Sequence, residues 1–96
     1  MNLHFTGRNF ELTPALKTHT EEKFAKLERF PNITNVNVVF VVEPSLQKVE
    51  ANLHYSGFDI HAEASGTDMY LAVDAAVDKL LTQVSKHHEK ITSHHG

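Results

Sequence analysis

Polar and apolar residues alternate along four short stretches of the chain, and apolar residues recur every three to four positions along two longer ones. Alternation is typical of a β-strand with one buried face, and the longer period is typical of an amphipathic helix. The alternating stretches are residues 2–6, 35–43, 48–55 and 58–64, and the helical stretches are 14–29 and 69–91. The predicted element order is therefore β-α-β-β-β-α.

Local signals mark where these elements begin and end. Thr13-Pro14 combines a helix N-cap with a proline at the first helical position. Pro31 disfavours helical geometry at the residue before it, so the first helix should end near Arg29. Ser56-Gly57 is a tight hairpin signal, and Asp68 is placed to cap the second helix.

Each predicted strand has only one reliably apolar face, so the sheet should be covered on one side and solvated on the other. Both helices carry a single apolar stripe and must share the covered side. The prediction is an α+β fold with a four-stranded sheet and two helices on one face, and its αβββα part has the topology of double-stranded-RNA-binding domains. The apolar stripes comprise Leu16, Phe24 and Leu27 in the first helix, and Met69, Val73, Val77, Leu80, Val84 and Ile91 in the second.

Composition narrows the class of protein. Ninety-six residues suit one domain, for which we expect residues 1–92, with 93–96 as a flexible C-terminal tail. The absence of cysteine excludes disulfides and thiolate metal sites, and the N-terminus lacks the features of a signal peptide. No apolar run approaches the ~20 residues of a membrane span, so we expect a soluble cytoplasmic protein. The net charge of −3 argues against indiscriminate nucleic-acid binding but leaves room for a local basic stripe.

Charged residues are sorted by side along the second helix. At ~100° per residue, three lysines fall within roughly 40° of one another, and the acidic residues lie on a different flank. This predicts a core stripe, a basic row and an acidic flank. The lysines are Lys79, Lys86 and Lys90, and the acidic residues are Asp74, Asp78 and Glu89.

The first helix shows a weaker version of the same sorting. His19, Lys23 and Lys26 cluster on one edge of its apolar stripe, with Arg29 further round, so two adjacent helices could form one basic surface. The alternative is that these are ordinary solvated helix faces, supported by pairs four residues apart and by the helix dipole.

Other chemistry is weakly indicated. Four histidines stand near the C-terminus, but neighbours on a helix diverge by ~100° and neither carboxylate nor cysteine completes a ligand set there. His54 and His61 should project from the open face of the sheet, where polar residues belong. No phosphate loop, nucleophile elbow or metalloprotease motif is present, so we expect no enzyme, no metal and no cofactor. The four histidines are His87, His88, His94 and His95.

Several segments resemble a known family, the short ribosome hibernation-promoting factors, also called sigma-54 modulation proteins. The turn Gly-x-Asp-Met-Tyr, with the Asp-Lys-Leu and Lys-His that follow it, is specific. The matching segments are FTGRNFELTPAL (5–16), KFAKLERF (23–30), ANLHYSGFDIHAEASGTDMYLAVDAAVDKL (51–80) and QVSKHHEK (83–90), which together span nearly the whole chain in the right order.

The resemblance implies a βαβββα fold and binding to 16S rRNA of the small ribosomal subunit near the decoding centre, where mRNA and tRNA would be blocked. It implies that a separate ribosome modulation factor helps to pair 70S ribosomes into 100S dimers in stationary phase. We expect neither the dimerisation domain of the long family members nor the acidic extension of a tail-bearing paralogue, and therefore the hibernation-promoting subtype and a monomer in isolation. Two readings compete: a tail-less inhibitor that stabilises idle 70S ribosomes without promoting 100S, and a module that modulates a transcription factor.

The resemblance and the charge pattern together predict contacts with rRNA phosphates. Thr82 and His88 depart from the basic residues expected in relatives, and both should dilute the basic row. Tyr70 is open between stacking on a base and packing within the protein. The predicted rRNA-binding residues are Arg8, Lys23, Lys26, Arg29, Tyr70, Lys79, Lys86, His87 and Lys90.

Overall fold

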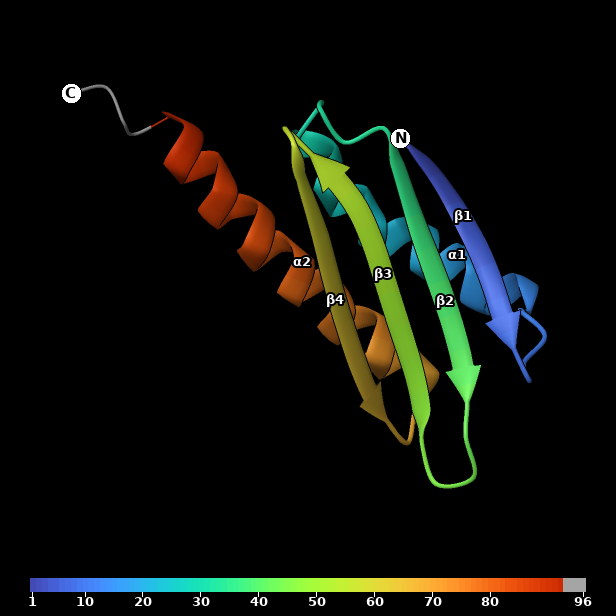
Figure 1. Cartoon of the computed structure of the whole chain (residues 1–96). Helices are drawn as coiled ribbons and strands as arrows, with labels where there is room; N and C mark the ends of the chain where they lie inside the picture. Colours follow the sequence, from blue (N-terminus) through green and yellow to red (C-terminus); the bar gives the residue numbers. More distant parts are fainter. Residues whose placement is uncertain (93–96) are drawn as a thin grey trace.

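The computed structural model describes residues 1–92, with side chains as far as Glu89, and its four strands form one sheet in the order β1-β2-β3-β4 (Figure 1). β1 pairs with β2 in parallel, and the other two pairings are antiparallel. A parallel pair needs a crossover connection, which α1 supplies. The strands are β1 Asn2–Arg8, β2 Asn35–Val42, β3 Gln47–Tyr55 and β4 Phe58–Gly66.

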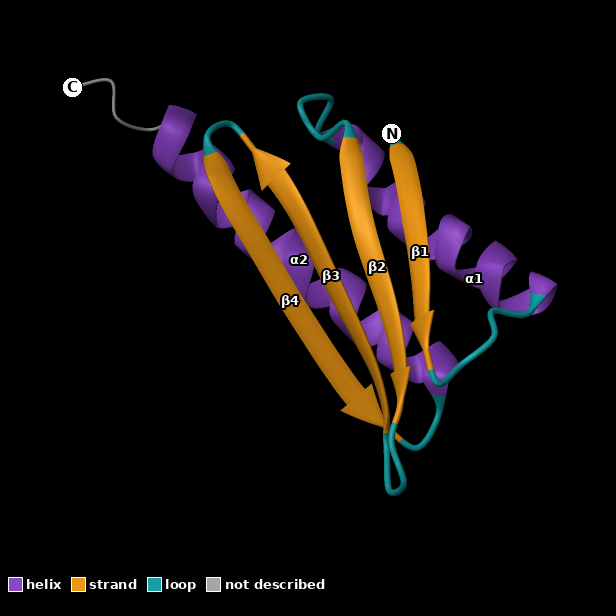
Figure 2. Cartoon of the chain, turned by 45° about the vertical axis from the view of Figure 1, so that its right-hand side comes forward, coloured by secondary structure: helices purple, strands orange, loops and turns teal. Residues whose placement is uncertain are grey.

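The helices cover one face of this sheet and leave the other open (Figure 2). α1 is Pro14–Phe24, the 3₁₀ segment η1 is Ala25–Arg29, and α2 is Met69–Thr92. The predicted helical end at Arg29 is correct, but its last part is a 3₁₀ helix rather than α-helix. The α+β class and the order β-α-β-β-β-α are confirmed.

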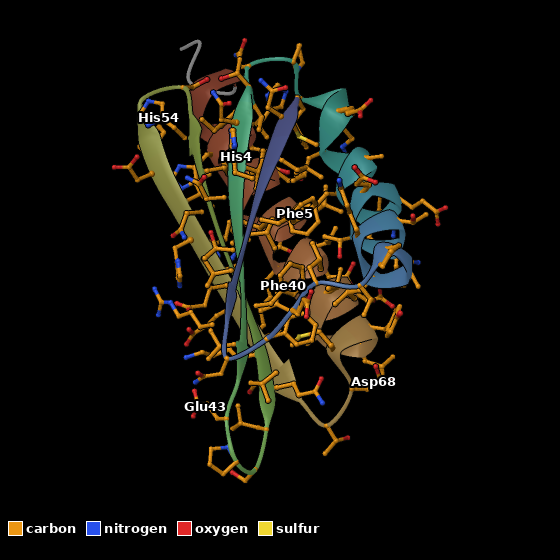
Figure 3. The ribbon with its side chains drawn as sticks, turned by 90° about the vertical axis from the view of Figure 1, so that its right-hand side faces the viewer. His4, Phe5, Phe40, Glu43, His54 and Asp68 are labelled. Carbon is orange, nitrogen blue, oxygen red and sulfur yellow. The ribbon has the colours of Figure 1, made fainter. Side chains whose placement is uncertain are left out.

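The core lies between the sheet and the helices, where the apolar face of each strand meets the helix stripes. Figure 3 shows Phe5 and Phe40 pointing toward the helices, whereas His54 lies on the opposite face. The predicted stripe residues with described side chains are all buried, and Thr20 is buried among them because its Oγ donates to the backbone oxygen of Leu16 at 2.7 Å. Ile91 lies outside the residues whose side chains are described.

Caps and turns follow the local sequence signals. The Thr13 Oγ accepts from the backbone N–H of Leu16 at 3.2 Å, and the Asp68 carboxylate accepts from the N–H of Tyr70 at 2.8 Å. Ser56 and Gly57 both have positive φ, as the tight β3–β4 turn requires. These contacts fix where each helix starts and which residues of β3 and β4 stand opposite each other.

α2 is longer than the sheet that it covers. Its 24 residues span about 36 Å, and its C-terminal part passes beyond the β3–β4 turn, where β4 begins (Figure 1). An aromatic group stabilises this part, because the Tyr55 hydroxyl is 2.8 Å from Nδ1 of His88 and the Phe30 ring packs edge-on against both rings. These contacts join the far half of α2 to the end of β3 and to Phe30.

Candidate nucleic-acid interface

Lys23 of α1 and Lys26 of η1 lie on the side of the first helix that faces α2. His19 marks this side, because its Nε2 lies 2.8 Å from Oδ1 of Asp74 in α2. Lys23 and Lys26 follow His19 by one and two helical turns, so they lie on the same side. Lys26 is exposed and Lys23 is half-buried. The structure therefore brings these two lysines together on the side of the first helix nearer α2, and we call Lys23 and Lys26 the α1 row.

Lys79 and Lys86 lie on the side of α2 away from α1, beside the edge strand β4. The Lys79 Nζ donates to the backbone oxygen of Glu63 at 2.7 Å, and the Gln83 amide donates to the backbone oxygen of His61 at 2.9 Å. Lys86 comes two turns after Lys79, continues along the same side and is exposed. We call Lys79 and Lys86 the α2 row.

These positions correct the expectation of a single basic surface formed by adjacent helices. The α1 row and the α2 row are separated by the body of α2, with Asp74 on the side nearer α1. Figure 2 shows that α2 lies behind β3 and β4, whereas α1 crosses behind β1 and extends past it, away from α2. A ligand that touches both rows must therefore reach around α2 or contact it from two sides.

The two arginines lie near opposite ends of the molecule. Arg29 ends η1, where its guanidinium lies 4.9 Å from the centre of the Phe30 ring and 3.5 Å from the Ser85 hydroxyl of α2. Arg8 is exposed at the end of β1, close to where both helices begin (Figure 1). Arg29 thus extends the α1 row toward the far half of α2, whereas Arg8 lies apart from both rows.

The two predicted ring contacts pack within the protein. Tyr70 meets the His19 ring edge-on at 4.9 Å between centroids, and 39% of Tyr70 remains exposed. His87 packs on the ring of Phe58 at 4.2 Å, and its buried Nδ1 has no hydrogen-bond partner among the described residues. Tyr70 therefore combines packing against α1 with a free ring surface.

The expectation that His88 dilutes the basic row was wrong. His88 bonds to Tyr55 and packs on Phe30, so it lies on the α1 side of α2 and not beside Lys79 and Lys86. Its ring helps to hold the far half of α2 against the sheet. Thr82 donates its hydroxyl to the backbone oxygen of Asp78 and stays exposed.

Two sequence expectations lie outside the described residues. The side chain of Lys90 is not described, although the backbone of α2 continues to Thr92. The expected tail at 93–96 is likewise not described.

The chain matches a family model along most of its length. Residues 3–92 match the model described as "Sigma 54 modulation protein / S30EA ribosomal protein". The chain belongs to this family. The match includes all the segments that resembled the family and the residues between them. The identification of the family from those segments is therefore confirmed.

Curated relatives and solved structures agree with this assignment. The chain is 46% identical over 95 residues to the proteins named ribosome hibernation promoting factor from Klebsiella oxytoca and Escherichia coli K12, covering 98% of this chain and 100% of each relative. It is 34% identical to a ribosomal subunit interface protein from Coxiella burnetii, with a TM-score of 0.84 over 92% of this chain and 98% of that one. The N-terminal domain of Thermus thermophilus Protein Y gives 32% identity and a TM-score of 0.83, covering 91% and 99%.

The helices within residues 1–92 do not have the features of a membrane span. Within residues 1–92, neither α1 nor α2 combines the length and the apolar character that a membrane-crossing helix needs. The long helix α2 instead carries charge on two of its sides.

Proposed function

We propose that this protein is a cytoplasmic ribosome hibernation factor that binds the small ribosomal subunit near the decoding centre and blocks mRNA and tRNA binding. The observation that carries the proposal is the 46% identity to ribosome hibernation promoting factors along their entire length. The proposed mechanism is occlusion without a chemical step. The protein fills a channel in the 16S rRNA, and its function depends on shape and charge.

The exposed basic side chains of the helices support this mechanism. Phosphate contacts fix the position and orientation of a protein on nucleic acid but read little sequence. Lys23, Lys26 and Lys86 offer unpaired ammonium groups within the described residues, and Lys79 donates only to a backbone oxygen. Specificity is therefore assigned to the shape of the ribosomal channel, and α2, with charge on both sides, is the element best suited to lie inside it.

Charge sorting explains how an acidic protein avoids stray RNA. The net charge is −3, and Asp74 lies between the two basic rows, on the side of α2 nearer α1, while Asp78 is exposed on α2 next to Lys79 in the sequence. The phosphates of free RNA are attracted by the lysines and repelled by the carboxylates at the same time. A channel with phosphates on two sides of α2 contacts the lysines of the two rows rather than the carboxylates. Arg8, Arg29, Tyr70, His87 and Lys90 complete the proposed contact set.

The first test is binding and competition. The purified protein should sediment with 30S and 70S particles, and it should displace tRNA from the small subunit in proportion to its own occupancy. The measurement is sucrose-gradient sedimentation with labelled tRNA. Full simultaneous occupancy by tRNA and the protein would exclude occlusion, and a failure to sediment with ribosomes would favour a module that acts on a transcription factor.

The second test concerns 100S ribosomes. Together with a ribosome modulation factor, the protein should increase the 100S peak, whereas alone it should give little, because we propose that it contributes only the subunit-binding step. The measurement is gradient analysis of purified 70S ribosomes with each protein alone and with both. Stabilised 70S without any 100S increase would favour the tail-less inhibitor.

A further inference from the structure

Three side chains with potential metal ligands converge on the open face of the sheet, where β3 pairs with β4. They are Glu50 of β3 and His61 and Glu63 of β4. One ligand atom from each lies within 4.8 Å of the other two, and Nε2 of His61 is 3.9 Å from Oε2 of Glu63. This face is opposite to the helices, so the cluster is distinct from both basic rows.

The strand register places two like charges directly opposite each other. Glu50 pairs with Glu63, and Asn52 pairs with His61. Like charges at directly opposed positions destabilise a sheet. The nearby lysines are engaged elsewhere, because Lys48 pairs with Glu43 and Lys79 donates to the backbone oxygen of Glu63, not to its carboxylate. Within residues 1–89, no lysine or arginine forms an ion pair with either carboxylate.

The imidazole of His61 is oriented in the way that a metal ligand requires. Its Nδ1 lies 2.5 Å from Oδ1 of Asn52, so Nδ1 donates and the lone pair of Nε2 faces the carboxylate side. Metal-binding histidines usually donate their second ring nitrogen to an oxygen acceptor in this manner, which fixes the tautomer and the direction of the ring. Asn52 therefore acts as a positioning residue for Nε2.

We propose that Glu50, His61 and Glu63 form a binding site for one zinc-class divalent transition-metal ion. A tetrahedral zinc with bonds of ~2.0–2.1 Å holds its ligand atoms about 3.3 Å apart. Rotation of the half-buried Glu50 and the exposed Glu63 side chains can supply the remaining closure of up to about 1.5 Å, and water completes the coordination. One imidazole with two carboxylates favours zinc over magnesium or calcium, which prefer oxygen ligands alone. The bound cation would also offset the repulsion between the two glutamates.

The direct test is isothermal titration of the full chain with zinc chloride. To remove competing ligands, the parent protein carries His94→Gln and His95→Gln. It should bind one zinc per chain saturably, and His61→Gln or Glu63→Gln in that background should weaken binding at least tenfold. His54→Gln is the matched control, because His54 lies on the same face but pairs with Asp59 at 2.9 Å; it should leave the affinity unchanged.

A second measurement separates metal binding from a structural role. Without metal, Glu50→Gln should raise the melting temperature by about one to a few degrees, because it removes a like-charge pair. With zinc at about 100 times the Kd, the parent should gain roughly 10 °C, and Glu50→Gln should lose most of this gain. The two effects of this substitution have opposite signs, which a purely structural role would not produce.

Three results would overturn the proposal. They are the absence of saturable zinc binding in the parent that keeps His61, equal weakening by His54→Gln and His61→Gln, and binding by the wild type that is lost in the His94/His95 parent. The site requires no ribosome, so none of these outcomes bears on the hibernation function.

Discussion

An alanine at position 40 should destabilise the protein severely. Phe40 is fully buried in β2. Its ring packs against the rings of Phe5 in β1 and of Phe10, with distances between ring centroids of 6.1 Å and 5.8 Å. Truncating a buried phenylalanine removes apolar contacts and leaves a cavity, which typically costs 3–5 kcal/mol. That is a large part of the roughly 5–15 kcal/mol by which a domain is stable. Urea unfolding followed by circular dichroism should show the loss as a lower midpoint.

The position of Phe40 makes relaxation of the site difficult. Phe10 returns over the end of β1 so closely that a side chain at Gly7 would collide with its backbone oxygen. The surrounding backbone therefore has little freedom to close the cavity. Leu71→Ala is the control, because Leu71 is 65% exposed and its loss should change the free energy of unfolding by about 0.5 kcal/mol or less. A loss below about 1 kcal/mol in Phe40→Ala would show that β1 is not anchored on this ring.

The fold was predictable because its elements are encoded locally. Alternation placed Val36, Val38 and Phe40 on the buried face of β2, and the Thr13 and Asp68 caps marked the helix starts. The 3₁₀ geometry of η1 was not predictable, since both helix types carry apolar residues three to four positions apart. Helical periodicity also continued through Arg29 without a signal for the change.

The candidate site was only partly predictable, because helix periodicity sorts side chains without naming their neighbours. The sequence separated the lysines of α2 from Asp74, but it did not show that Asp74 turns toward His19 while Lys79 turns toward β4. His88 was misplaced for the same reason. Which side of a helix faces a partner depends on packing between elements far apart in the chain.

The glutamate–histidine cluster, in contrast, had a signal that was missed. A two-residue turn pairs the residues that flank it, here Tyr55 with Phe58. Counting back along both strands places Glu50 opposite Glu63. The spacing of histidines along the chain could not reveal this cluster, because strand pairing places residues side by side that are more than ten positions apart in the sequence.

Removing either basic row should weaken ribosome binding while the fold survives. The two variants, Lys23→Ala/Lys26→Ala and Lys79→Ala/Lys86→Ala, each delete two positive charges at largely exposed positions, where substitutions usually cost about 0.5 kcal/mol or less. Each phosphate contact contributes roughly 0.7–0.9 to the slope of log affinity against log salt. At about 0.15 M salt this corresponds to roughly a four- to sixfold loss of affinity per contact.

Each double variant should therefore bind about 15- to 35-fold more weakly, with a salt slope lower by about 1.4–1.8. The measurement is sedimentation or fluorescence titration with 30S subunits at several salt concentrations. Lys17→Ala/Lys48→Ala is the matched control. It removes the same net charge from the far side of α1 and from the open sheet face, where Lys48 pairs with Glu43 at 3.8 Å. Its affinity should fall much less.

The comparison between the two rows tests how α2 lies in its site. Because the rows are on opposite sides of α2, phosphates on both sides predict similar losses for the two variants and roughly additive losses when they are combined. Contact along one side only predicts a loss for one row and a control-like result for the other. Asp78→Asn, on the outer surface of α2, should leave specific binding unchanged and strengthen binding to unrelated RNA. If the control variant weakens binding as much as either row does, net charge rather than placement governs binding, and the role proposed for the two rows is wrong.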